Sequence, residues 1–241
     1  MSRVLPILFN TEMVRAIQRK LHPKTTTRRC IKGYIPKDAR WGYTMFTPKG
    51  YISCRGTFSG EYGEKFFKLP YQKGDILYVR ETWNFVYNLD DNGQIVEDTG
   101  RYVYYADDSM PFLYWTNPDT GERKDKMPWK PSIHMPKDAA RIWIRVTDVQ
   151  VERLKEITKE KIKSEGIYDD GTHPTDKKVK IRPEIAHLCG EWTDEAYKER
   201  FAMIWDSTIK KSDLARYGWL ANPWVWVIEF ERCEKPEEGK K

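Results

Sequence analysis

The residues best suited to chemistry lie together in one short stretch, residues 24–29, which reads Lys-Thr-Thr-Thr-Arg-Arg. A lysine amine can act as a base when its pKa is lowered, and a threonine hydroxyl can attack or donate a hydrogen bond. An arginine guanidinium offers a fixed fork of donors that suits a phosphate or a carboxylate. A lysine beside a hydroxyl is one way to activate a nucleophile. A solvated basic loop is the plainer interpretation of the same residues, because charge runs usually lie on solvated faces.

Two predicted elements precede this stretch and would position it. Residues 4–9 are apolar and predict a first strand, and Asn10 is a typical N-cap for a helix that follows. Pro23 ends that helix, because the residue before a proline is pushed out of the helical region. We therefore expect residues 24–29 to be presented from the end of a packed helix. The apolar face of that helix would consist of Met13, Val14, Ile17 and Leu21.

The rest of the chain contains more predicted strands than helices. Apolar or alternating runs predict strands at residues 43–46, 51–54, 76–80, 101–106, 141–154 and 224–232. Polar, turn-rich composition predicts surface loops at residues 88–100, 117–126 and 168–180, and an extended connection at residues 129–136. Thr158 and Thr193 are the expected N-caps of a short and a long helix. This order has too few alternating strand–helix units for a doubly wound sheet, and it predicts an α+β fold with a small, mostly antiparallel barrel.

One acidic residue stands against its local preference. Glu165 comes just before Gly166, which suits the position that ends the short helix. The helix dipole favours cations at that end, so an acid there is locally unfavourable by a few tenths of a kcal/mol. An exposed glutamate would tolerate this cost, but a residue placed against local preference can also have another use.

Composition limits the classes of function. The net charge of +6 is mildly basic and compatible with a polyanionic partner such as nucleic acid. The four cysteines lack the spacing of a zinc site, so we expect no metal, no cofactor and no disulfide framework. No run is long enough to span a membrane and residues 4–9 are too short for a signal peptide, so a cytoplasmic protein is expected.

Several motifs together resemble the ASCH domain family, a relative of the PUA fold. They are residues 24–29 after the early helix, the Gly-Asp-Ile-Leu-Tyr-Val-Arg-Glu-Thr-Trp run at residues 74–83, residues 157–167, and the closing strand at residues 224–232. Pro-Ser-Ile-His-Met-Pro at residues 131–136 and Asn-Pro-Trp-Val-Trp at residues 222–226 are similar to a phage-borne or prophage-borne branch.

The resemblance implies one PUA-like domain over residues 1–233. That domain would be a five- or six-stranded barrel with a few peripheral helices and insertions at about residues 33–68 and 88–128, followed by a flexible tail at residues 234–241. A phage-encoded protein of this kind would work in the cytosol of a bacterial host.

The resemblance also implies a site and a reaction. Small members of the family hydrolyse the amide of N4-acetylcytidine with a lysine, a threonine three residues later and a glutamate, and the matching positions here are Lys24, Thr27 and Glu165. His22 stands where the family often has glycine. The expected binding residues for substrate or nucleic acid are Arg28, Arg29, Arg80, Glu81, Trp83 and His134.

Other functions remain open from the sequence. A non-catalytic reader of modified bases in RNA or, less favoured, DNA would use Lys24, Arg28 and Arg29 as phosphate contacts. A ribonuclease would need His22 or His134 near residues 24–29, and a phage accessory factor would make no catalytic use of them. Trp83 is either a stacking platform for a base or a core residue.

Overall fold

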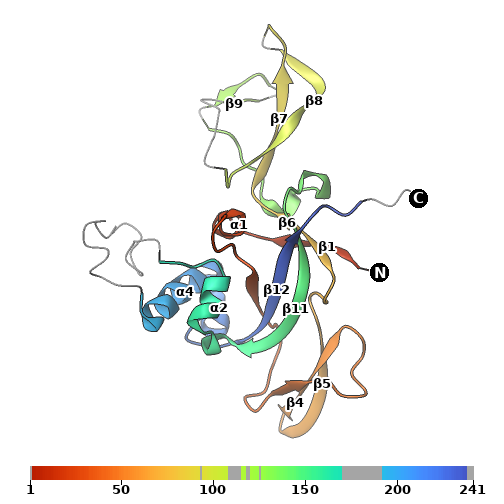
Figure 1. Ribbon diagram of the computed structural model, residues 1–241, viewed down its shortest axis with the longest axis vertical. Coiled ribbons are helices and arrows are strands. Elements are labelled where there is room, and N and C mark those ends of the chain that lie inside the picture. Colours follow the sequence, from red (N-terminus) through yellow and green to blue (C-terminus); the bar gives the residue numbers. More distant parts are fainter. Residues whose placement is uncertain are drawn as a thin grey trace. The chain divides into compact units, whose positions relative to one another are not determined.

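The computed structural model describes residues 2–92, 94–107, 115–117, 120–124, 126–169 and 192–237 (Figure 1). The fold is α+β, with strands in both parallel and antiparallel pairs and few helices. The chain divides into two compact units. The first unit contains Met1–Arg19, Ile76–Ile144 and Arg232–Lys241, and the second contains Lys20–Asp75 and Arg145–Glu231. The single domain expected over residues 1–233 stays a prediction.

The first unit begins with the expected strand and helix. Strand β1 (Val4–Leu8) pairs in parallel with β6 (Ile76–Arg80), and the Asn10 side chain caps helix α1 (Thr11–Gln18) by accepting from the Met13 backbone N–H at 2.9 Å. The helix ends earlier than expected, because Arg19 already has an extended backbone with ψ of 140°. Leu21 is therefore not on a buried helical face, and 78% of it is exposed.

A hairpin in the first unit replaces a predicted loop. Strands β7 (Trp83–Leu89) and β8 (Ile95–Tyr104) pair antiparallel, so the loop expected over residues 88–100 was wrong. The sequence signal fails because the apolar side chains in this part of the hairpin, Leu89, Ile95 and Val96, are all exposed. A second, short pair joins β9 (Trp115–Thr116) to β10 (Arg123–Lys124). The extended connection expected at residues 129–136 is interrupted by one short 3-10 helix, η1 (Ser132–His134), and the backbone is extended at Pro131, Met135 and Pro136. A second 3-10 helix, η2 (Lys137–Ala139), follows it.

The second unit contains the strands around residues 24–29. Strand β2 (Thr26–Cys30) pairs antiparallel with β12 (Trp224–Cys233), and β11 (Trp143–Arg153) lies on the other side of β12. The second unit also contains the following helical elements: η3 (Leu154–Glu156), α2 (Lys159–Ser164), α4 (Asp194–Thr208), η4 (Lys211–Asp213) and α5 (Leu214–Tyr217). The expected N-caps are confirmed: Thr158 accepts from Lys161 N–H and Thr193 from Ala196 N–H. The shared core consists of Leu154, Ile157, Ile162, Trp192, Tyr197, Phe201, Trp205, Val225 and Val227.

A separate three-stranded antiparallel sheet forms most of the expected insertion at residues 33–68. Its order is β3 (Arg40–Gly42), β4 (Tyr51–Phe58) and β5 (Glu61–Lys68). The strand expected at residues 51–54 lies within β4, but residues 43–46 are not a strand. The expected closed barrel is not shown by the strand pairings of the described residues. No helix within the described ranges is both long and apolar enough to cross a membrane.

Candidate functional site

Backbone hydrogen bonds fix the start of β2 against two other elements of the second unit. The Thr25 N–H donates to the Ser164 carbonyl at 2.9 Å, and the Phe230 N–H donates to the Thr25 carbonyl at 2.9 Å. The residue after Lys24 is thus tied to the residue before Glu165. Our expectation that a helix end would present this stretch was wrong, because an extended segment and a strand hold it instead.

An ion-pair network brings together three residues singled out in the sequence. The Lys24 ammonium pairs with one carboxylate oxygen of Glu165 and also donates to the Glu165 backbone carbonyl at 3.0 Å. The Arg28 guanidinium donates to the other carboxylate oxygen at 2.9 Å. The exposed side-chain fractions are 1% for Lys24, 1% for Arg28 and 7% for Glu165. One carboxylate therefore serves two buried cations.

The network continues to a residue that sequence reasoning missed. The second terminal nitrogen of Arg28 lies 3.3 Å from a carboxylate oxygen of Glu152 on β11, and the other Glu152 oxygen pairs with Lys161 on α2. Charges alternate from Lys24 to Lys161, and exposure rises toward Lys161, whose side chain is 41% exposed. The only sequence signal for Glu152 is an acid within a strand that otherwise alternates apolar residues, which is too common to identify a site.

Burial lowers the pKa values of two cations in this stretch, Lys24 and Arg29. Desolvation lowers the pKa of Lys24 below its usual value, and the nearby charges of Arg29 and Arg28 act in the same direction. The charge of Glu165 and its hydrogen bond oppose this lowering without cancelling it. Burial also lowers the pKa of Arg29, against the charge of Glu165. Lys24 is therefore closer to exchanging a proton at neutral pH than an exposed lysine would be.

Thr27 carries the other unusual feature of the stretch. It lies on β2 opposite Ile228 of β12 and is fully buried. Its hydroxyl oxygen has no hydrogen-bond partner among the residues that the structure describes. Native folds rarely leave a buried hydroxyl unpaired, because the lost hydrogen bond costs about 1–3 kcal/mol. The Thr27 hydroxyl therefore retains an unused donor and acceptor, at a position that solvent does not reach.

Glu165 occupies the C-cap of α2, as its position before Gly166 indicated. Gly166 adopts a φ of 86°, the left-handed conformation that ends a helix, and donates its N–H to Lys163 at 2.8 Å. The carboxylate pairs with Lys24 and Arg28, which offsets the unfavourable end of the helix dipole. The residue that contradicted local preference is therefore explained by tertiary contacts.

His22 occupies a backbone conformation that favours glycine. Its φ is 52°, in the left-handed region, and its ring lies against Tyr168 with 4.8 Å between centroids. A side chain at such a φ costs free energy that glycine would not incur, and the ring contact with Tyr168 helps to offset this cost.

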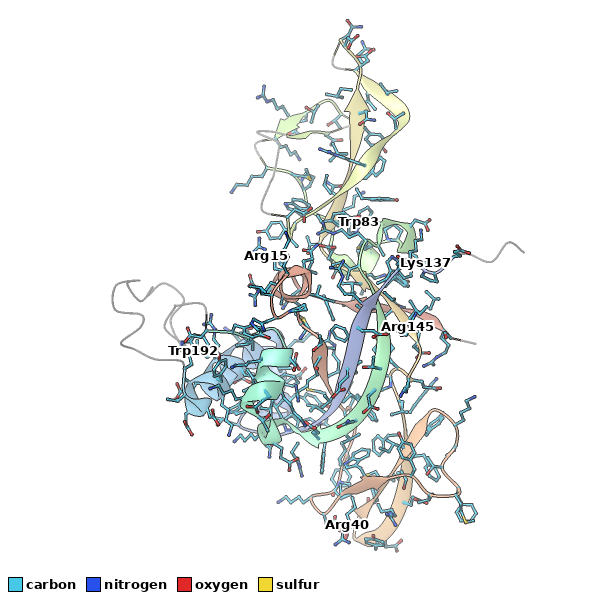
Figure 2. The ribbon with its side chains drawn as sticks, viewed as in Figure 1. Arg15, Arg40, Trp83, Lys137, Arg145 and Trp192 are labelled. Carbon is cyan, nitrogen blue, oxygen red and sulfur yellow. The ribbon has the colours of Figure 1, made fainter. Side chains whose placement is uncertain are left out.

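The remaining candidate residues belong to the first unit (Figure 2 labels Trp83). Trp83 is 7% exposed and packs against Tyr102, so it is a core residue of that unit. Arg80 donates to the Ile133 carbonyl at 3.1 Å, and His134 is exposed in η1. The contacts of Trp83 and Arg80 lie within the first unit, and the expected binding roles of Arg80, Trp83 and His134 stay predictions.

Glu81 is held in a second buried ion pair. Both of its carboxylate oxygens accept from Arg141, at 2.9 and 3.0 Å, and Arg141 also pairs with Asp107 at 2.8 Å. Burial raises the pKa of Glu81, and the hydrogen bond from Arg141 acts against this. This bidentate pairing with Arg141 engages both carboxylate oxygens of Glu81.

Comparisons with protein-family models, with curated proteins and with solved structures found no match to this chain. In the part of the chain that the structure describes, no group of three or more His, Cys, Asp or Glu side chains could hold a metal ion. The candidate site is therefore the cluster of Lys24, Arg28 and Glu165 with the neighbouring Thr27.

Proposed function

We propose that the chain hydrolyses an amide on a modified pyrimidine nucleoside or nucleotide, of the N4-acylcytidine type. The observation that carries this proposal is the buried ion pair of Lys24 and Glu165, three residues from a buried Thr27 hydroxyl that lacks a partner among the described residues. The resemblance of these three positions to the small ASCH amidohydrolases supports the same reaction.

Lys24 is the base in this proposal. Burial lowers its pKa, so the neutral amine is easier to reach than in an exposed lysine, and in this scheme the neutral amine takes a proton from the group that attacks the acyl carbon. The bond between the acyl carbon and N4 then breaks, and the proton passes to the leaving N4 amine. One water is consumed, either in the first attack or in cleaving an acyl-enzyme, and the products are cytidine or its nucleotide and a carboxylic acid. Glu165 orients the amine and stabilises its protonated form between the two transfers.

Thr27 supplies a hydroxyl to the acyl group. As a nucleophile it would form an acyl-enzyme that water later cleaves, and as a donor it would stabilise the tetrahedral oxyanion. The two roles predict different chemistry, because only a nucleophile leaves an acyl adduct on the protein. Mass spectrometry after rapid quenching with an acyl substrate would detect that adduct on Thr27.

Arg28 is a positioning residue in this scheme. Its guanidinium bridges Glu165 and Glu152, so it is occupied by carboxylates on both sides. A buried, paired arginine is poorly suited to bind a phosphate, and the same holds for Lys24. This pairing favours the hydrolase over a non-catalytic reader that would use these cations as phosphate contacts.

The test is hydrolysis of N4-acetylcytidine by the whole chain, followed by chromatography of released cytidine. Lys24→Arg keeps a charge but removes an accessible neutral amine, Thr27→Val keeps the shape but removes the hydroxyl, and Glu165→Gln removes the carboxylate. Each should abolish release. Lys155→Met is the matched control on an exposed lysine and should release cytidine like the wild type. Absence of release by the wild type at enzyme concentrations equal to the substrate would refute the proposed substrate.

A further inference from the structure

The sheet of β3, β4 and β5 has two faces of very different composition. Antiparallel pairing places opposite residues on the same face, so the register defines each face. One face carries Ile52, Cys54 and Phe58, which are at most 8% exposed. Trp41 shares that inner face and packs against Trp224 of β12, with 5.7 Å between ring centroids. The inner face is thus anchored in the second unit.

The other face combines exposed aromatic rings with cations. Tyr62 is 69% exposed and Phe66 is 39% exposed, both on β5. The same register places Tyr51 diagonally next to Phe66, where rings in a sheet can share a ligand. We call this outer face the aromatic platform. It consists of Arg40 on β3, Tyr51, Arg55 and Thr57 on β4, and Tyr62, Glu64, Phe66 and Lys68 on β5; Ser53, on the same side of β4, is fully buried.

Charge on the aromatic platform favours a polyanion. Its cations are Arg40 (labelled in Figure 2), Arg55 and Lys68, all exposed, and Arg40 lies directly opposite Arg55 in the register. Its acid is Glu64, whose carboxylate accepts from the Ser53 hydroxyl. Asp38 lies at the margin and is held by the Thr57 N–H and hydroxyl, at 3.0 and 2.8 Å. The cations of the platform therefore outnumber its acids.

Protection of the edge strand β5 against pairing with other chains explains only part of the composition of the aromatic platform. Edge strands often carry charges that prevent pairing with other chains, and Glu61, Glu64, Lys65 and Lys68 fit that role on β5. Exposed tyrosine and phenylalanine rings between those charges do the opposite, because they add apolar surface to an open edge. Rings interleaved with cations on one face of an antiparallel sheet match the two needs of a single nucleic-acid strand, which are stacking surfaces for bases and cations for phosphates.

We propose that the aromatic platform binds a single-stranded polynucleotide, with bases stacked on Tyr51, Tyr62 and Phe66 and phosphates near Arg40, Arg55 and Lys68. This site is separate in sequence from Lys24, Thr27 and Glu165, and the proposal does not depend on the hydrolase assignment. Unpaired bases are required, because bases stacked within a duplex do not offer their faces to side chains.

The test uses fluorescence anisotropy of the whole chain with labelled oligouridylate, labelled oligothymidylate and a duplex of matched length, over a salt series. Both single strands should bind, and the duplex should bind more weakly. Tyr62→Ala with Phe66→Ala should weaken binding about 25-fold or more, since each lost stack costs about 5-fold or more. Arg40→Gln with Arg55→Gln should make the slope of log affinity against log salt shallower by about 1.4. Tyr87→Ala, on a tyrosine of β7 that is 41% exposed, is the matched control and should bind like the wild type.

Three results would overturn the proposal. They are no binding of either single strand, equal binding of the duplex, and wild-type binding by the Tyr62→Ala, Phe66→Ala variant. Light scattering covers the alternative occupant, a second copy of the chain: a dimer that this variant dissociates, without binding of single strands, also refutes the proposal. Hydrolysis of free N4-acetylcytidine by the same variant should stay unchanged, so failure of one proposal is distinguishable from failure of the other.

Discussion

Replacing Glu165 by glutamine should destabilise the second unit much more than replacing Lys24 by methionine. Both substitutions break the same ion pair and keep the approximate size of the side chain. They differ in what they leave behind. Glu165→Gln leaves two buried cations, Lys24 and Arg28, without the carboxylate that serves both. Lys24→Met leaves Glu165 paired with Arg28 at 2.9 Å and removes a buried ammonium from the interior.

The magnitude follows from the cost of an uncompensated buried charge. Removing one partner of a buried pair costs about 3–5 kcal/mol, whereas replacing a buried pair by apolar side chains is often close to neutral. We expect Glu165→Gln to cost about 3–5 kcal/mol and Lys24→Met about 1 kcal/mol. For a chain of this length the larger loss corresponds to a fall in Tm of about 6–20 °C. The double variant should recover about 2 kcal/mol relative to the sum of the single variants.

The assay must report on the second unit, because two units can unfold in separate transitions. Urea unfolding would give the free energy of unfolding, and amide hydrogen exchange at Thr25 and Phe230 would report on the site itself. Both of these N–H groups hydrogen-bond within the backbone around Lys24. A Lys24→Met variant as destabilised as Glu165→Gln, or additive effects in the double variant, would refute the view that Glu165 is the shared counterion.

Three further predictions follow from other features. The pKa of Lys24 is lowered in the folded chain, so between that pKa and about 10.4 the unfolded chain binds a proton that the folded chain does not. The free energy of unfolding should therefore rise with pH across this window in the wild type, relative to Lys24→Met, and denaturant titrations at several pH values should show the difference. Gly100→Ala should destabilise the β7–β8 hairpin by about 1–3 kcal/mol, because an added Cβ would lie 2.4 Å from the Val86 carbonyl oxygen; an unchanged Tm would contradict this. His22→Gly should change the free energy of unfolding by less than about 1 kcal/mol, since the relief of backbone strain at a φ of 52° offsets the lost Tyr168 contact. His22→Val should cost about 1–2 kcal/mol more, because a β-branched residue tolerates that φ poorly, and thermal unfolding would show the difference.

Local sequence determined the elements that flank the site. Thr158 caps α2 and Gly166 ends it, because a hydroxyl at the N-terminus and a left-handed glycine at the C-terminus act within one helical turn. The alternation of side chains at residues 224–232 predicted β12 for a similar reason. A strand repeats every two residues, so its pattern is visible within a short segment. Glu165 was recognisable as an anomaly on the same local grounds.

The tertiary structure decided what surrounds these residues. Lys24 and Glu165 are 141 positions apart, and only the pairing of β2 with β12, together with the bond from Thr25 to Ser164, brings them into contact. Local pattern contains no information on that pairing, nor on Glu152, whose role comes from its neighbours on other elements. The part of the β7–β8 hairpin within residues 88–100 was missed for a related reason, because its apolar residues Leu89, Ile95 and Val96 are exposed and its pairing is specified by hydrogen bonds across the strands. Sequence alone thus determined which side chains have reactive groups, and the long-range strand pairing decided which of them are buried, paired and able to act together.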